Sequence, residues 1–121
     1  MATNTKMTGD FSRKPQTMAL AEKIIALVQS FGPSRQSIAG QMTFGGKRKF
    51  LWLWTYGHTA DGTLYVTVCL DQKIDNDNFH YVKQVSRNRW NHHVVVKSSE
   101  QIDSPWFRHL LEAGYAFGHG A

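Results

Sequence analysis

Residues 49–56 read KFLWLWTY, and their pattern is the strongest indication of the fold in the sequence. Large rings occupy positions 50, 52, 54 and 56, whereas Leu51 and Leu53 occupy two of the alternate positions. This period of two is typical of a β-strand, and it places the rings on one face and the leucines on the other. Because both faces are apolar, we expect a central strand that the terminal helices cover on both sides.

Further strands are predicted on the C-terminal side of this stretch. The β-branched segment 64–70 follows an Asp61-Gly62 turn signal, so the two strands form a predicted hairpin. Arg87-Asn88-Arg89 separates segments 80–86 and 90–97, which predicts a second hairpin. In its second strand, one face holds Trp90, His92, Val94 and Val96, and the other holds Asn91, His93, Val95 and Lys97. A short strand is expected at 41–44 and a polar loop at 71–78.

Two helices flank the strands. Pro15 suits a first helical position, apolar residues then recur with helical spacing up to Phe31, and Gly32-Pro33 ends the pattern. This predicts a helix over 15–31. Ser104 and Pro105 predict the start of a second helix, whose apolar face includes Gly114. A glycine inside a helix costs about 1 kcal/mol against alanine, so we expect Gly114 to pack closely against the sheet.

These elements indicate an α+β fold, an antiparallel sheet of four to five strands with N- and C-terminal helices packed on it. The chain has 121 residues, which suits one domain. We expect a flexible N-terminal arm at 1–13 and a single α+β domain at 14–121.

Composition narrows the function classes. Lys and Arg number 14 against 9 Asp and Glu, and the net charge of +5 favours anionic partners unless these charges are merely solvated. No apolar run approaches the roughly 18 residues that span a bilayer, and residues 1–10 lack a signal core. We therefore expect a cytoplasmic protein without a membrane partner. Cys69 is the only cysteine, which excludes an intrachain disulfide and favours a small buried side chain over a nucleophile.

Two segments combine basic and aromatic residues. Lys47, Arg48 and Lys49 follow a Gly-Gly pair and precede Trp52 and Trp54. Cations contact phosphates and rings stack on bases, so this segment is a candidate nucleic-acid site. The alternative is a solvated hairpin turn next to core tryptophans. The spacing of a phosphate-binding P-loop is missing.

The second segment contains Arg87, Arg89, Trp90, His92 and His93. If its turn lies near Lys47, one basic patch results. Adjacent histidines on a strand point to opposite faces, so they do not suit one metal ion. His92 is typical of a satisfied interior histidine, whereas a cleft would make His93 a candidate acid or base.

Other constellations are weaker. Asp71, Asp75 and Asp77 suggest a calcium loop only faintly, because the glycine and the closing glutamate are missing. Ser98 and Asp103 could be drawn into a triad with His93, but no nucleophile elbow surrounds the serine, and caps of helical turns are the simpler interpretation. We expect no metal, no cofactor and no complete catalytic motif.

Several motifs together resemble a known family. They are Lys14-Pro15, Phe31-Gly32-Pro33, the run 44–54, the run Arg89 to Val94, Ile102-Asp103 and Ala113-Gly114-Tyr115. Over about residues 12–118 the chain is similar to a bacterial family of domains of unknown function, distantly similar to YdhG-like and MmcQ/YjbR-like small α/β proteins. Members carry alanine-tyrosine near the last motif, so Gly114 is a departure. The resemblance implies a fold but no reaction; the DNA-binding label of MmcQ-like relatives implies a nucleic-acid partner only by analogy.

Three functional hypotheses follow. The first is a non-enzymatic binding domain whose basic aromatic surface recognises an anionic partner such as nucleic acid. The second is a small-molecule pocket or an enzyme, anchored by His92 or His93 and walled by Trp52, Trp54, Tyr65, Tyr81 and Trp90. The third is a homo-oligomer formed through a sheet edge or the aromatic face.

Overall fold

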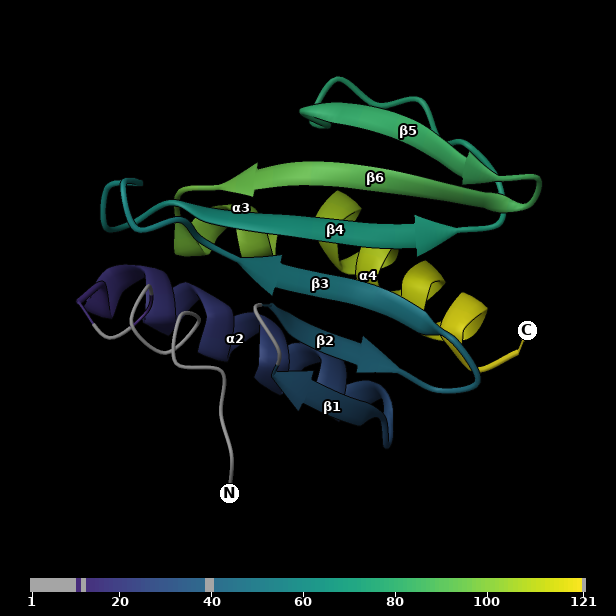
Figure 1. Cartoon of the computed structure of the whole chain (residues 1–121), viewed down its shortest axis with the longest axis horizontal. Helices are drawn as coiled ribbons and strands as arrows, with labels where there is room; N and C mark the ends of the chain where they lie inside the picture. Colours follow the sequence, from purple (N-terminus) through teal and green to yellow (C-terminus); the bar gives the residue numbers. More distant parts are fainter. Residues whose placement is uncertain (1–10, 12, 39–40, 121) are drawn as a thin grey trace.

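The computed structural model describes residues 11, 13–38 and 41–120, and it contains the predicted α+β fold (Figure 1). The predicted arm at 1–13 lies almost wholly outside the described residues, although Phe11 is buried in the core. The elements in chain order are α2 (Pro15–Phe31), β1 (Arg35–Ile38), β2 (Met42–Gly45), β3 (Lys49–Trp54), β4 (Leu64–Leu70), β5 (Tyr81–Ser86), β6 (Arg89–Val96), α3 (Ser99–Asp103) and α4 (Pro105–Gly118).

The strands form one antiparallel sheet in the order β1-β2-β3-β4-β6-β5. Both predicted hairpins are confirmed, because β3 pairs with β4 and β5 pairs with β6. The sheet has six strands rather than four to five, because the polar segment Arg35–Ile38 pairs with β2 as an edge strand. Its sequence has no apolar alternation to signal a strand. The segment after β4 carries the chain to the far edge, and β6 returns between β4 and β5.

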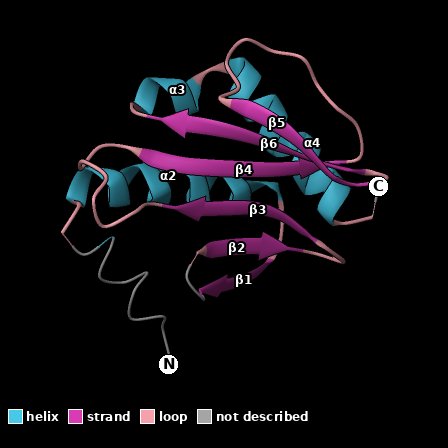
Figure 2. Ribbon diagram, turned by 45° about the horizontal axis from the view of Figure 1, so that its top comes forward, coloured by secondary structure: helices cyan, strands magenta, loops and turns pink. Residues whose placement is uncertain are grey.

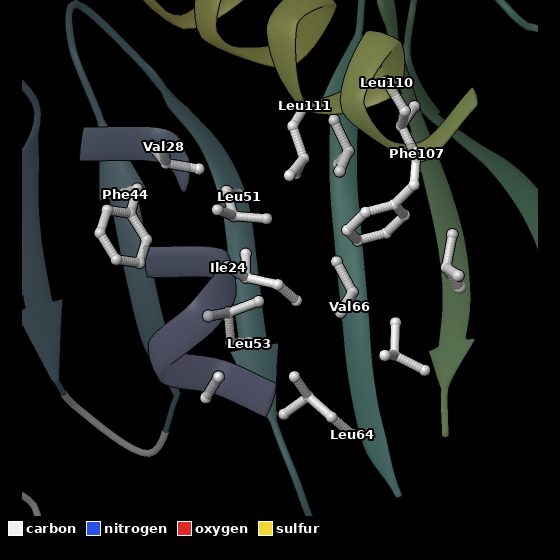
Figure 3. Packing of buried hydrophobic residues seen from close by; sticks show 14 of the residues in the cluster. Ile24, Val28, Phe44, Leu51, Leu53, Leu64, Val66, Phe107, Leu110 and Leu111 are labelled. Atoms are coloured by element: carbon white, nitrogen blue, oxygen red, sulfur yellow. The ribbon is translucent and has the colours of Figure 1, made fainter. Parts of the chain in front are cut away.

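The three helices of the described residues, α2, α3 and α4, lie on one face of the sheet (Figure 2). Ile24 of α2 and Leu111 of α4 point toward Leu51 and Val66 on the same side of the strands (Figure 3). The prediction that β3 is central is confirmed, but the prediction that helices cover both of its faces is wrong. Leucine and valine side chains of the sheet pack against the apolar faces of the helices. The opposite face carries aromatic residues with polar atoms, which tolerate partial contact with water.

A β-bulge at Phe50 changes the predicted alternation. Phe44 is paired with Leu51, and the next pair along β2 joins Gly45 to Lys49, so Phe50 is an extra residue on β3. Phe50 and Leu51 are consecutive, yet both are fully buried on the helix side. The prediction that Phe50 shares a face with the tryptophans of β3 is therefore wrong. Simple alternation fails here because a bulge depends on the partner strand.

Helix α4 packs closely on the sheet, as the glycine at position 114 predicts. A Cβ atom at Gly114 would lie 2.6 Å from Cγ1 of Val68. The hydroxyl of Ser104 does not cap α4 and donates instead to the carbonyl of Gln101. The preceding turn α3 is capped as predicted, since Ser98 Oγ accepts from the Gln101 amide.

The N-terminus of α2 is held by the turn between β3 and β4. Asp61 accepts hydrogen bonds from the amides of Thr17 at 2.9 Å and Gln16 at 3.3 Å, and from the Thr17 hydroxyl. Burial alone would raise the pKa of Asp61. The hydrogen bonds favour the carboxylate, however, so the pKa lies below its ordinary value of 3.8. The predicted turn residue Gly62 adopts a positive φ of 99°.

Candidate binding face

The sheet face opposite the helices is a candidate binding surface, which we call the open face. The strand register places one row of side chains on it across all six strands. The row is Ser37, Thr43, Trp52, Thr67, His93 and Tyr81, in strand order. Trp54 and Tyr65 are paired in the next row. Figure 1 shows α3 and α4 passing behind the strands, so no helix of the described residues covers this face.

Aromatic rings form a connected series at the end of the open face where β3 ends, and we call this series the aromatic row. Successive ring centroids lie between 4.1 and 6.4 Å apart, with Tyr81 and His93 closest and Trp54 and His93 farthest. Its seven members come from four strands and from residues adjoining them: His58, Tyr56, Tyr65, Trp54, His93, Tyr81 and His80. Tyr56 and Tyr81 are 45% and 51% exposed, so ring surface is open to a ligand.

A cavity of about 210 Å³ opens within the aromatic row. Its aromatic walls are Trp54, Tyr56, Tyr65 and Tyr81, and the imidazoles of His80 and His93 complete the lining together with parts of valines 66, 94 and 95. Ligand sites in proteins typically combine apolar walls with a few polar groups. The hypothesis of a small-molecule pocket therefore applies to this cavity. Of the residues expected to line the pocket, Trp52, Trp90 and His92 do not line the cavity.

His93 is held rigidly at the floor of this cavity. Its Nδ1 lies 2.8 Å from Thr67 Oγ1, and its ring stacks on Tyr81 at an interplanar angle of 22°. Burial lowers the pKa of His93 below its ordinary value of 6.5, and repulsion between its protonated form and nearby His80, His92 and Lys83 lowers it further. The imidazole is therefore neutral near pH 7, with one donor and one acceptor nitrogen.

His92 lies on the other side of β6, inside the core. Its Nε2 accepts a hydrogen bond from the Ile74 amide at 3.0 Å, and its Nδ1 faces the Val68 carbonyl at 3.3 Å. The side chain is fully buried, and burial lowers its pKa. This is the satisfied interior histidine that its spacing indicates, and it cannot touch a ligand on the open face. Trp90 shares that side, because it is paired with Leu70 in register with His92.

The turn between β2 and β3 does not offer three free cations. Arg48 Nε donates to the Phe117 carbonyl at 2.7 Å, and its guanidinium lies 4.0 Å from the centroid of the Phe117 ring. This side chain fastens the turn to α4. Lys47 and Lys49 are exposed, and together with Arg35 they rim a groove of about 320 Å³ that also touches Ser37 and Thr43.

The two basic turns lie at the same end of the sheet. The antiparallel order places the start of β3 beside the end of β4 and the start of β6, so Lys49 and Arg89 occupy one end of their strands. Figure 1 shows the β2–β3 and β5–β6 turns on the same side of the molecule. Cys69 lies between them on β4. Burial raises the pKa of its thiol, and the nearby charges of Arg89 and Arg48 partly offset that rise.

The carboxylates of the described residues lie outside the strands. Within the described residues, the six strands contain four cations and neither Asp nor Glu. The described acidic residues lie on helices and connecting segments, where Asp103 is paired with Lys23 and Glu112 with Arg108. The register places the strand cations toward the open face: Arg35, Lys49, Lys83 and Arg89. An anion that approaches the sheet from this side meets no strand carboxylate.

The weaker candidates from the sequence have structural roles. Ser98 caps α3 and Asp103 binds Lys23, so neither is joined to His93. In the segment after β4, Asp75 is paired with Lys73 at 3.5 Å, and Asn76 accepts hydrogen bonds from Asn78. Among the described residues no group of three His, Cys, Asp or Glu side chains could hold a metal ion. Within the same residues, no helix has the length and apolar character needed to cross a membrane.

Several residues of the open face were not predicted as site residues from the sequence. Tyr56, His58 and His80 lie in the segments that connect strands, and Lys83 and Arg35 lie on edge strands. The available signal was the absence of Asp and Glu from every predicted strand, together with the rings that end β3 and begin β5.

Comparisons with known proteins give the family but no described activity. No curated protein and no solved structure matches the chain. The model of one family, the domain of unknown function DUF5655, matches residues 7–118, which is nearly the whole sheet and helix architecture described above. The chain therefore belongs to the DUF5655 family.

Proposed function

We propose that this domain binds single-stranded nucleic acid across its open face. One observation carries the proposal: among the described residues, no helix covers this sheet face, and it combines a row of aromatic rings with cations and no strand carboxylate. Base stacking on aromatic side chains and phosphate contacts with Lys and Arg are the two interactions that sequence-tolerant single-strand binding requires. Bases must be unpaired to stack on such a surface, so the proposal favours single strands over duplexes.

The dimensions of the face suit a short strand. The basic end at Lys49 and the aromatic end at Trp54 are separated by roughly 16 Å along β3, a length that about five stacked nucleotides cover. Trp52 lies between them and supplies ring surface along the path. Phosphates at the basic end and bases at the aromatic end would thus be bound by one continuous strand.

A titration of fluorescent oligonucleotides tests this function. A single-stranded probe of about 12 nucleotides should bind at low salt and weaken as salt rises, because phosphate contacts release counterions. Lys49→Gln and Lys83→Gln should each weaken binding. Arg108→Gln makes the same charge change on the helix side, at an exposed residue of α4, and should have little effect. Absence of binding to any oligonucleotide at low salt would overturn the proposal.

The cavity in the aromatic row supports a second candidate function. A small aromatic ligand between Trp54 and Tyr81, with His93 as its polar partner, would make the protein a small-molecule-binding domain or an enzyme. A thermal-shift screen of metabolites separates the two functions. A metabolite that raises the unfolding temperature in the absence of oligonucleotide binding would favour this candidate.

The proposal also covers the relatives, the location and the oligomeric state of the protein. A relationship to the MmcQ/YjbR-like and YdhG-like proteins of bacteria agrees with a nucleic-acid partner. A cytoplasmic location would give the protein access to such a partner. Assembly into a homo-oligomer through a sheet edge or the open face stays a prediction, which light scattering decides; a dimer through the open face would compete with nucleic acid.

A further inference from the structure

We infer that the cavity of the aromatic row receives one unstacked nucleobase of the bound strand and so gives the domain a base preference. This inference rests on the proposed function and assigns a specific role to one part of the face. Elsewhere on the open face, contacts with phosphates and with single rings would be indifferent to sequence.

The shape of the cavity fits a planar heterocycle. Trp54 and Tyr65 stack with an interplanar angle of 22°, and Tyr81 and His93 stack with the same angle. The rings of His93 and Trp54 are nearly perpendicular, at an interplanar angle of 86°, so the two stacked pairs form adjoining walls. A volume of about 210 Å³ accommodates one base. Ring faces at these walls attract a flat π-system more than they attract an aliphatic group.

Polar groups around the cavity suit the edge of a base. Trp54 Nε1, the hydroxyls of Tyr65 and Tyr81, and His93 Nε2 make no hydrogen bond to another described residue. His93 Nδ1, in contrast, is engaged by Thr67, which fixes the ring. Donors and acceptors fixed beside a stacking wall distinguish bases by their hydrogen-bonding edges.

Charge argues against a cation as the occupant. Aromatic cavities also bind quaternary ammonium groups, but among the described residues such a ligand would meet the Lys83 ammonium here and no strand carboxylate. A nucleotide has the opposite preference, because its phosphate would lie near the Lys83 ammonium while its base entered the cavity. Charge complementarity therefore selects a base that is attached to a phosphate.

Abasic oligonucleotides test the inference directly. A strand with one abasic position retains its phosphates but lacks one ring. Wild-type protein should bind a set of oligonucleotides that differ only at one central base with unequal affinities, and an abasic residue there should weaken binding roughly 5- to 150-fold, the range for one base stacked on aromatic side chains.

Variants of Tyr81 test the role of the cavity, and a variant of Val85 provides the control. In Tyr81→Ala the differences among the bases should shrink while the salt dependence stays unchanged. Tyr81→Phe, which keeps the ring, should retain the affinity and lose only part of the preference. Val85→Ala changes a side chain of the same strand with 49% exposure that lies outside the cavity, and it should behave as wild type.

The outcomes separate this inference from the proposed function. Salt-dependent binding with equal affinity for all bases, unchanged by Tyr81→Ala, would overturn the base cavity and leave single-strand binding intact. Free nucleoside monophosphates could instead bind, quench the fluorescence of Trp54 and fail to bind Tyr81→Ala, while oligonucleotides do not bind. This result would support the cavity and overturn the proposed function. Absence of binding to either probe overturns both.

Discussion

At the scale of single residues, adjacent side chains on β6 have opposite roles. His92 is enclosed and bonded to the backbone on the helix side, whereas His93 forms the floor of the cavity on the open side. Strand alternation alone predicts that the two differ. The alternation of His92 with Trp90, Val94 and Val96 predicts that His92 is the interior histidine, and its complete burial confirms this.

The buried histidine makes stability depend on pH. Burial lowers the folded-state pKa of His92, so below about pH 6.5 the unfolded state binds the proton first. The contribution to the free energy of unfolding is therefore complete above the unfolded pKa and decreases as pH falls from about 7 toward 5. We expect His92→Gln, whose amide can bond to Ile74 and Val68, to flatten this dependence. Urea denaturation at several pH values measures it, and an unchanged slope would contradict the assignment.

At the scale of elements, the sequence predicts the longer helices and the hairpins, but it does not predict the β-bulge at Phe50. Helical spacing gave α2 and α4, and turn signals gave both hairpins. The extra residue Phe50 depends on the register of β2, and the position of Arg48 depends on the end of α4, so neither follows from a local pattern. The basic turns meet at one end of the sheet because β6 returns beside β4, which no single segment encodes.

The contact between α4 and β4 gives a prediction at this scale. Gly114→Ala gains helix propensity, but its Cβ would lie 2.6 Å from Val68 Cγ1. Overpacking outweighs the gain, and we expect a net loss of about 1–2 kcal/mol in the free energy of unfolding. Val68→Ala should remove the clash, so the double variant should lose less than the two single losses combined. Additive losses in a denaturation cycle would argue against the close contact.

The hydrogen bonds of Asp61 at the N-terminus of α2 give a second prediction. The folded-state pKa of Asp61 lies below its ordinary value, so its stabilising contribution is present above about pH 4 and is lost as pH falls through the folded pKa. Asp61→Ala should lower the melting temperature at pH 7 and reduce the difference in stability between pH 5 and pH 3. Melting curves at the three pH values check this. A variant as acid-sensitive as the wild type would exclude Asp61 as the source.

At the scale of the whole molecule, the sheet carries cations without carboxylates among the described residues. Helices and loops carry the described carboxylates, and the open face carries the four strand cations. If all four contact phosphates, the logarithm of the affinity should fall with the logarithm of salt concentration with a slope of about −3, and each Lys→Gln change should reduce the slope by about 0.7. Titrations at three salt concentrations measure it. A slope near zero would exclude phosphate contacts.

The four tryptophans report which face of the molecule binds. Trp52 and Trp54 lie on the open face, whereas Trp90 lies on the helix side of β6 and Trp106 of α4 packs against Phe79 and Phe107. The most direct measurement is an NMR titration of the four indole N–H signals with a single-stranded oligonucleotide at low salt. Shifts of the Trp52 and Trp54 signals alone are the expected result. Shifts of the Trp90 and Trp106 signals instead, or no shift of any indole, would contradict binding at the open face.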